Sequence, residues 1–180
     1  MRLLPGQEAI FIDGERMVTL RERLRPGLKA VIVGFNPSPV SVAAGHYYQG
    51  QLGKRLWSRL QQYELTTGLA AGREDDSAFA LGFGFADLVR RPTARANALT
   101  TAEKSTAVTD LVRRLLILPD RPLVLFVFAG VARLAGPALT REGFQTRNFP
   151  GHYAARSEVA ARMAELKREL DELSGNRGSG

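Results

Sequence analysis

The sequence contains no cysteine and only two histidines among 180 residues. The absence of cysteine excludes disulfide bonds, thiolate zinc sites and iron-sulfur clusters, because each of these requires cysteine sulfur. Two histidines leave few ligands for any other transition-metal site. We therefore expect chemistry that uses neither a metal ion nor a cofactor.

The sequence also lacks an apolar run long enough to cross a bilayer, and its first residues, MRLLPGQEAIF, lack the long apolar region of a secretory signal. These features predict a protein of the cytoplasm, associated with the nucleoid. A length of 180 residues and an apolar fraction of 44% are typical of one domain with a substantial core. The formal net charge of +7 favours a polyanionic partner, although many basic proteins bind none.

The most informative stretch is an apolar, β-branched run from Lys29 to Val33 that ends abruptly in Gly-Phe-Asn-Pro-Ser-Pro. The run predicts a buried strand, and the glycine and prolines that follow prevent its continuation. Asn36 is thereby placed at the carboxyl end of a strand, where open α/β sheets bind their ligands. Its amide is suited to orient a ligand or a water molecule. An Asx-turn, in which the side chain bonds its own backbone, explains the residue equally well.

The rest of the chain alternates predicted strands with predicted helices. The clearest buried strand is Leu123 to Ala129, and Thr101 to Leu116 has the apolar spacing of an amphipathic helix. Such alternation predicts a single three-layer α/β/α domain with a mostly parallel central sheet. We assign this domain to residues 24–174. An N-terminal extension (1–23), which Asp13-Gly14 can turn into a hairpin, precedes it, and a disordered tail (175–180) follows it.

The stretch from Val40 to Gly53 is rich in glycine, aromatic and amide residues and predicts a binding loop. Within it, His46, Tyr47 and Tyr48 place three rings in a row. Rings presented in this way can stack on nucleobases, which contributes about 1 to 3 kcal/mol per base, although one or two of them can equally pack beneath the loop. Trp57 is expected in the core of the following helix.

Two later segments carry charge beside a predicted strand end. Asp87 is the only charged residue in the apolar stretch from Ala78 to Val89, where it is either a turn or helix cap or a buried carboxylate that serves catalysis. Arg90, Arg91 and Arg95 follow at once and predict contacts with phosphate. By contrast, the polar stretch from Thr66 to Ser77 predicts a surface connection without chemistry.

Taken in order, these motifs resemble those of the mismatch-specific uracil-DNA and thymine-DNA glycosylases, a branch of the uracil-DNA glycosylase superfamily. The resemblance runs from about Leu24 to Leu173. Residues 34–38, Gly-Phe-Asn-Pro-Ser, are similar to the family's Gly-Ile-Asn-Pro-Gly motif. Gly45-His46-Tyr47-Tyr48 and Arg55-Leu56-Trp57 resemble the family's pocket loop and the helix after it. Residues 84–89, Gly-Phe-Ala-Asp-Leu-Val, with Arg91-Pro92-Thr93, match a further family segment in both order and spacing.

The resemblance implies a role for each residue that matches. Asn36 would position or polarise the attacking water, and Tyr48 would stack on the extruded base. The backbone around Phe35, Pro37 and Ser38 would read the polar edge of that base. Such a pocket is needed because an enzyme cannot reach a base inside a duplex until the base has been flipped out of the stack.

The sequence departs from the family's pattern at three places. Ser38 replaces the usual glycine and is expected to narrow the pocket floor. Asp87 stands where relatives often carry lysine or asparagine, and it adds a carboxylate able to act as a base. His152 begins a segment that differs from the family's Asn-Pro-Ser-Gly-Leu-Ser; it either bonds the oxygen of the leaving base or faces solvent. The family's large apolar wedge is missing, so Tyr153 or Arg156 must take its place.

We therefore expect a monomeric DNA repair glycosylase that acts on double-stranded DNA and hydrolyses the N-glycosidic bond of uracil opposite guanine. Thymine and other damaged pyrimidines are further candidate substrates. Arg90, Arg91, Arg95, Tyr153 and Arg156 are the expected DNA contacts. The alternative is a catalytically weak protein that binds nucleic-acid lesions on the same fold.

Overall fold

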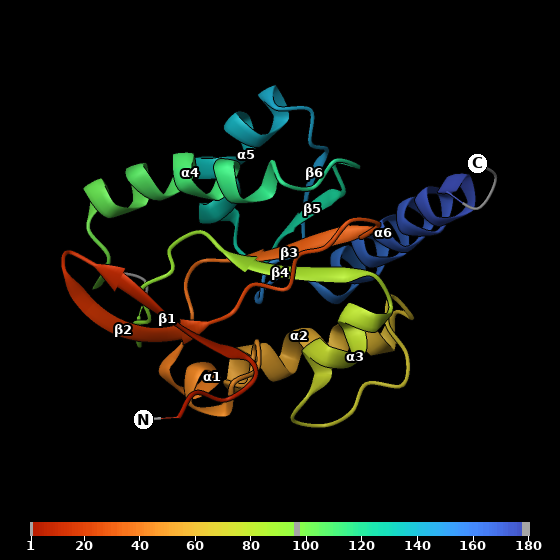
Figure 1. Ribbon diagram of the computed structural model, residues 1–180. Coiled ribbons are helices and arrows are strands. Elements are labelled where there is room, and N and C mark those ends of the chain that lie inside the picture. Colours follow the sequence, from red (N-terminus) through yellow and green to blue (C-terminus); the bar gives the residue numbers. More distant parts are fainter. Residues whose placement is uncertain (1, 96–97, 178–180) are drawn as a thin grey trace.

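The computed structural model describes residues 2–95 and 98–177. Its centre is a sheet of four parallel strands in the order β4-β3-β5-β6 (Figure 1). The strands are β3 (Ala30–Gly34), β4 (Phe83–Asp87), β5 (Leu123–Phe126) and β6 (Thr146–Asn148). In the register, Ile32 lies between Phe85 and Leu125. The predicted α/β fold with a parallel central sheet is thus confirmed.

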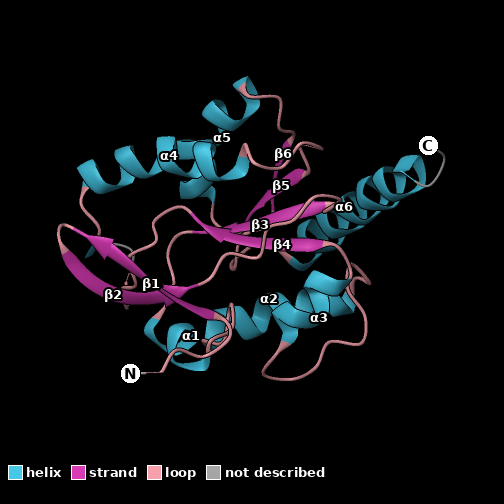
Figure 2. Ribbon diagram, in the orientation of Figure 1, coloured by secondary structure: helices cyan, strands magenta, loops and turns pink. Residues whose placement is uncertain are grey.

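Helices cover both faces of the sheet, which explains why β3, β4 and β5 are apolar throughout (Figures 1 and 2). Alternate residues of a strand point to opposite faces, so Ile32 packs in one core cluster and Val33 in the other. The first face is covered by α2 (Gln51–Gln62), α3 (Glu74–Ala80) and α6 (Arg156–Arg177). The second face is covered by α4 (Thr101–Leu115) and α5 (Ala129–Arg141).

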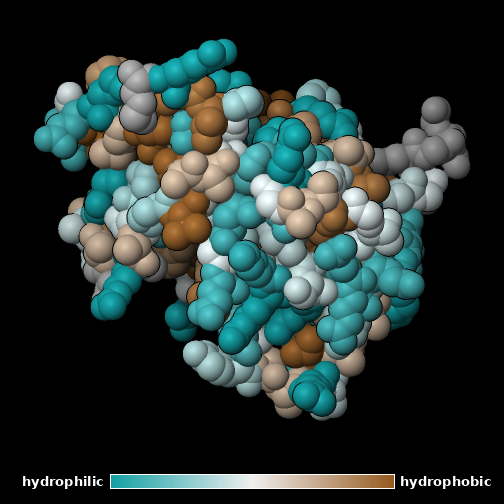
Figure 3. All heavy atoms as spheres, turned by 90° about the horizontal axis from the view of Figure 1, so that it is seen from below, coloured by the Kyte–Doolittle hydropathy of each residue, from teal (hydrophilic) through white to brown (hydrophobic). Residues whose placement is uncertain are grey.

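The helices keep their polar sides toward solvent. Figure 3 views the molecule from the side of α1 (Pro39–Ala44), α2 and α3, where hydrophilic side chains predominate and hydrophobic ones form small separate groups. Trp57, in α2, has its side chain turned inward and is 2% exposed, as predicted. None of the helices in the described part of the chain has both the length and the apolar character needed to cross a bilayer.

The N-terminal extension forms an antiparallel hairpin of β1 (Gln7–Ile12) and β2 (Glu15–Leu20). Asp13 and Gly14 form its turn, with positive φ angles of 51° and 81°. Two consecutive residues with positive φ are typical of the tight turn whose twist matches that of the two strands. The chain leaves the hairpin through Arg23, which pairs with Phe85 at the edge of the main sheet.

Two segment boundaries differ from the sequence-based expectation. Helix α6 continues to Arg177, three residues into the expected tail, and residues 178–180 lie outside the described part of the chain. Helix α3 begins at Glu74, within the last part of the expected surface connection, and its Asp75 is fully buried. The prediction that Thr66 to Ser77 is only a surface connection was therefore wrong for α3, because Asp75 forms buried hydrogen bonds with residues 46 and 47.

Candidate active site

A pocket of about 460 Å³ opens at the carboxyl ends of β3, β4 and β5. These ends bring together segments that are far apart in the sequence, as in other open α/β sheets. The pocket is lined by eight of the residues that the sequence suggested for function: Phe35, Asn36, Pro37, Ser38, Tyr48, Asp87, Arg95 and His152. The structure brings these residues together and shows how each side chain is held.

Asn36 is fixed by hydrogen bonds that all use its side-chain nitrogen. Its Nδ2 donates to Thr93 Oγ1 at 2.7 Å, to the Arg91 carbonyl at 3.1 Å and to the Pro37 carbonyl at 3.4 Å. Thr93 Oγ1 in turn donates to the Arg95 carbonyl at 2.8 Å, so it accepts from Asn36. Because carbonyls only accept, this network defines which end of the amide is the nitrogen. No described residue donates a hydrogen bond to the side-chain oxygen, so this atom can accept one from a ligand or a water.

Asp87 is the last residue of β4 and lies directly beside Gly34 in the sheet register. It is 4% exposed, and among the described residues none donates a hydrogen bond to its carboxyl group. Burial, followed by the nearby negative charge of Glu22, raises the pKa of Asp87 to about 7, against the opposing charges of Arg114 and Arg90. A carboxyl group with such a pKa can exchange a proton near neutral pH.

Gly34 is required where Asp87 and Tyr48 approach each other. A Cβ atom at this position would overlap Asp87 Oδ1 and would lie 3.0 Å from the Tyr48 hydroxyl oxygen. Both side chains therefore lie over the bare backbone of Gly34. The glycine that ends the predicted strand has a packing role in the pocket as well as a role in ending the strand.

Tyr48 belongs to an aromatic group beneath the pocket loop. Its ring meets the rings of Trp57 and Phe85 edge-on, at centroid distances of 5.9 and 6.2 Å, and it adopts a left-handed φ of 57°. The neighbouring Tyr47 is buried and stacks on Phe85 at 5.5 Å. The expectation that one or two of the rings pack beneath the loop fits Tyr47, which is buried, and both tyrosines border the pocket.

His152 reaches the pocket from the segment after β6, where its ring lies 5.8 Å from that of Phe128. Its Nε2 atom is enclosed and has no hydrogen-bond partner among the described residues. Burial, together with the positive charges of Arg59 and Arg55, lowers the pKa of His152. The ring is therefore neutral at neutral pH, with a polar atom available to a ligand. The ring as a whole is half-buried, with Nε2 on its enclosed side.

Ser38 has a structural function in addition to its place in the pocket lining. Its hydroxyl accepts a hydrogen bond from the Ser41 backbone N–H at 3.2 Å and so caps the start of α1. Serine is among the residues preferred at this position, because its side chain satisfies an otherwise unpaired N–H group. Ser38 thus fixes the turn that carries Asn36 into α1.

The five expected DNA contacts fall into two groups. Arg90 pairs with Glu8 at 2.6 Å, and Arg91 pairs with Glu103 at 2.7 Å, so both arginines have partners within the chain. The other three face outward: Arg95 is exposed and lines the pocket, Tyr153 is completely exposed beside His152, and Arg156 is exposed at the start of α6. The outward group has side chains available for a partner at the rim of the pocket.

Comparison with known proteins identifies the family. The model of the uracil DNA glycosylase superfamily matches residues 22–176. The chain belongs to this superfamily. Its fold is also similar to the solution NMR structure of a protein from Methanosarcina acetivorans that was proposed to be a uracil DNA glycosylase, with a TM-score of 0.61 and 18% sequence identity. That similarity covers 87% of this chain and 97% of the other. Membership of the superfamily supports a DNA glycosylase role.

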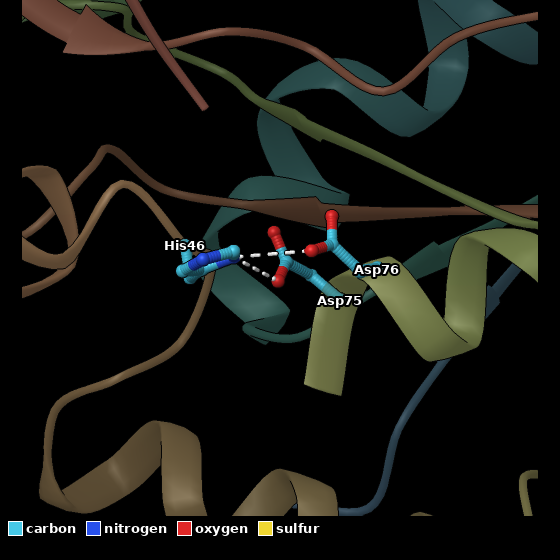
Figure 4. Close-up of side chains that lie close together, drawn as sticks. All are labelled: His46, Asp75 and Asp76. Atoms are coloured by element: carbon cyan, nitrogen blue, oxygen red, sulfur yellow. Dashed lines mark hydrogen bonds and ion pairs between the residues drawn. The ribbon is translucent and has the colours of Figure 1, made fainter. Parts of the chain in front are cut away.

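One residue that shapes this glycosylase pocket was missed by the sequence reasoning. Asp75, in α3, accepts hydrogen bonds from the Tyr47 backbone N–H at 3.1 Å, and its other oxygen lies 2.8 Å from His46 Nδ1 (Figure 4). Gln49 of the same loop donates to Glu74, at 2.9 Å. The first turn of α3 thus holds the pocket loop. No local pattern indicates this, because Asp75 lies in a polar stretch and its partners are 28 and 29 residues away.

His46, Asp75 and Asp76 also form the one group of histidine and acidic side chains in the described residues that is compact enough to share a metal ion. His46 Nδ1 and the carboxylate oxygens of Asp75 and Asp76 already have partners within the chain. Arg23 forms an ion pair with Asp76 and lies 3.8 Å from Asp75, and the Tyr47 N–H bonds Asp75. Since the Arg23 guanidinium already supplies a positive charge to both carboxylates, the group acts as an internal clamp on the loop.

Proposed function

We propose that this protein hydrolyses the N-glycosidic bond of uracil opposite guanine in double-stranded DNA, and that its range extends to thymine and other damaged pyrimidines. The observation that carries the proposal is the convergence of Asn36, Asp87 and His152 on one pocket in a member of the uracil DNA glycosylase superfamily. The three groups come from three strand ends and supply a fixed amide, a buried carboxyl and a neutral imidazole.

The pocket fits a base that has left the duplex. A flipped base needs an apolar face on which to stack and polar groups that bond its edge. Tyr48 and Phe35 supply rings in the lining, while the backbone of Pro37 and Ser38 lies beside them. A volume of about 460 Å³ accommodates a pyrimidine together with the water that attacks the sugar.

The proposed reaction assigns a separate task to each polar group. The C1′–N1 bond breaks, its electron pair goes to the base, and the sugar gains positive charge in the transition state, as in glycoside hydrolysis. The ionised Asp87 carboxylate stabilises that charge and takes a proton from the attacking water. Asn36 orients the water through its side-chain oxygen. Neutral His152 donates a hydrogen bond from Nε2 to the oxygen of the departing base, which carries negative charge.

The rim of the pocket supplies the proposed contacts with DNA. Arg95 and Arg156 are exposed and can neutralise phosphates, and the exposed Tyr153 can fill the space that the flipped base leaves. Arg90 and Arg91 have carboxylate partners within the chain, which offset part of the positive charge that a phosphate would meet. We therefore assign the main phosphate contacts to Arg95 and Arg156.

The decisive experiment is a strand-cleavage assay for abasic sites on end-labelled duplexes that contain G:U, A:U or G:T. An enzyme with the proposed function produces alkali-labile strands, fastest from the G:U duplex. A protein that only binds lesions retards the G:U duplex on a native gel and leaves the strands resistant to alkali. An Asp87→Asn preparation is the matched control for contaminating glycosylase activity and for DNA binding, because Asp87 is buried and the outer surface of the variant is unchanged.

Tyr48 provides a test of base stacking. We expect Tyr48→Ala to lose roughly 1 to 3 kcal/mol of affinity for the lesion-containing duplex, because one ring face no longer stacks on the extruded base. Affinity for an undamaged duplex of the same sequence should change little. Equal losses on the two duplexes, measured by fluorescence anisotropy, would mean that the ring only supports the loop.

A further inference from the structure

The hairpin β1–β2 lies almost entirely before residue 22, where the match to the superfamily begins. In Figure 1 it lies beyond the carboxyl ends of β3 and β4, beside α1 and the first turns of α4. We propose that this hairpin is a functional part of the base pocket: Thr19 positions the segment that orients Asn36, and Leu20 forms a wall that limits the size of the base. This inference rests on the proposed glycosylase function.

Thr19 is the contact between the hairpin and the segment after β4. Its side chain is fully buried, and its Oγ1 donates to the Arg90 carbonyl at 2.7 Å. The Arg90 guanidinium also contacts the hairpin: it donates hydrogen bonds to the Glu8 carboxylate at 2.6 Å and to the Leu20 carbonyl at 3.3 Å. The Arg90 residue is thus held at both its backbone and its side chain by the hairpin.

The next carbonyl along the chain belongs to the site itself. Arg91 O accepts a hydrogen bond from Asn36 Nδ2 at 3.1 Å, one peptide beyond the carbonyl that Thr19 bonds. The Arg90 carbonyl belongs to the planar peptide that ends at Arg91 Cα, and the Arg91 carbonyl belongs to the next plane, which starts at that atom. A shift of the first plane therefore moves the atom from which the Arg91 carbonyl is oriented. Thr19 is therefore a positioning residue, which acts on Asn36 through the backbone of residues 90 and 91.

The hairpin also holds the opposite wall of the pocket. The Gln7 side chain donates to the Val42 carbonyl of α1 at 2.6 Å. Gly6 approaches the Gly45 carbonyl so closely that a Cβ atom at Gly6 would overlap it. The hairpin thus connects α1 and the start of the pocket loop to the segment after β4, and the pocket lies between these two walls.

Leu20 contributes directly to the lining of the pocket. It is 2% exposed and belongs to the same core cluster as Tyr47, Trp57 and Phe85, the rings beneath the loop. A branched apolar side chain in the wall restricts the space available to a base with an additional methyl group, such as thymine. In an apolar pocket, a difference of one such group changes discrimination by about 10- to 200-fold.

The first test compares Thr19→Val with Thr19→Ser. Valine keeps the shape of threonine and removes the donor, whereas serine keeps the hydroxyl. We expect the Val variant to reduce the single-turnover rate on G:U DNA about threefold to tenfold while KM stays within about twofold of the wild-type value. The Ser variant should recover most of the rate. Equal rates for Val, Ser and wild type would overturn the role of Thr19.

The second test concerns the size of the base. We expect Leu20→Ala to raise the rate on G:T relative to the rate on G:U by about tenfold, because the wall recedes. Leu118→Ala is the matched control, since Leu118 is a leucine that is 1% exposed in the other core cluster and does not line the pocket. An unchanged ratio in Leu20→Ala, or an equal increase in Leu118→Ala, would overturn the specificity role.

Hydrogen exchange separates a failure of this inference from a failure of the proposed function. In the Thr19→Val protein, the amides of residues 88–95 should exchange faster than in the Thr19→Ser protein, while those of α5 should not change. If the wild type produces no abasic sites but this difference is present, the glycosylase proposal fails and the positioning contact stands. If the wild type is active and exchange in residues 88–95 is unchanged, the hairpin proposal fails.

Discussion

The carboxyl ends of β3 and β4 each deliver one polar side chain to the pocket, Asn36 and Asp87, and the chain holds the two in opposite ways. The Asn36 amide has three hydrogen-bond acceptors around its nitrogen. The Asp87 carboxyl is buried without a donor from the described residues, and its pKa is raised to about 7. One group therefore has a fixed orientation, and the other has a mobile proton.

This difference indicates separate roles for the Asn36 amide and the Asp87 carboxyl group in the proposed reaction. An amide does not titrate, so Asn36 can contribute only orientation and polarity, and its network supplies both. A carboxyl with a pKa about 3 units above its ordinary value of 3.8 costs stability when it ionises, and it becomes a stronger base in return. We therefore expect Asn36 to set the rate through geometry and Asp87 to set its dependence on pH.

The largest expected effect comes from Asp87→Asn. Single-turnover excision of uracil should fall toward the upper end of the about 10²- to 10⁴-fold range that is typical of a lost general base. In the wild type the rate should rise with pH through about 7, because only the ionised carboxylate accepts a proton. In the Asn variant this dependence should be absent between pH 5 and pH 8.5.

A defined result for Asp87→Asn would contradict the role of Asp87 as a base. A variant with the wild-type rate and a lowered melting temperature would make Asp87 a cap instead of a base. Measuring both quantities on the same preparation distinguishes these roles. Rates should be compared per folded molecule, as judged by circular dichroism.

Asn36→Ala is expected to reduce the rate less, by about 10²-fold, because Asp87 still accepts the proton. The rise in rate through pH 7 should persist at the lower amplitude, since the titrating group is intact. A pH profile recorded beside that of Asp87→Asn makes the comparison direct. If the rise also disappears in Asn36→Ala, the amide controls the protonation of Asp87 and the two groups do not act separately.

Most of this arrangement follows from local patterns in the sequence. The strand that ends in Gly34-Phe35-Asn36-Pro37 placed an amide at a sheet edge, and the lone charge of Asp87 marked the end of the neighbouring strand. Parallel strands that end at one edge bring such residues together, so the pocket was predictable. The structure bears out the parallel sheet and the buried Trp57 for the same reason, because hydrophobic periodicity encodes both.

What local patterns do not encode is the choice of partner. Arg90 and Arg91 are predicted to contact phosphate, and the local sequence does not indicate that they pair with Glu8 and Glu103, which are 82 and 12 residues away. Asp75 lies in a polar stretch that is typical of a surface, and it is buried because the loop of His46 and Tyr47 closes over it. Pairings across such separations depend on the fold and leave no periodic signal.

Asp87 also affects how the stability of the protein changes with pH. Its ionisation lowers stability, whereas ionisation of an ion-paired carboxylate raises it. The unfolded chain releases this proton near 3.8, whereas the folded protein keeps it to about 7. Between these values the folded state binds more protons, so stability is highest in acid and decreases as the pH rises toward 7. Asp87→Asn should therefore be more stable than wild type at pH 8, by about 1 to 3 kcal/mol, and similar at pH 4.

Urea unfolding at pH 4 and at pH 8 measures this effect. Part of the decrease should remain in the variant, because burial also raises the pKa of Glu22, which lies near Asp87. A variant that is less stable than wild type at pH 8 would show that ionised Asp87 is stabilised by contacts in the folded state. That result would remove the reason to treat Asp87 as a strong base.

The smallest expected effect comes from Thr93→Val, which tests whether orientation alone matters at Asn36. Thr93 Oγ1 accepts from Asn36 Nδ2 at 2.7 Å, and valine removes this acceptor while the Arg91 and Pro37 carbonyls remain. Because one of three bonds is lost, the rate should fall only about threefold to tenfold, with the rise through pH 7 unchanged. Thr93→Ser, which keeps the hydroxyl, should restore the rate. A wild-type rate in Thr93→Val would mean that the two carbonyls suffice to orient the amide, and a shifted pH profile would mean that Thr93 acts through Asp87 instead of through Asn36.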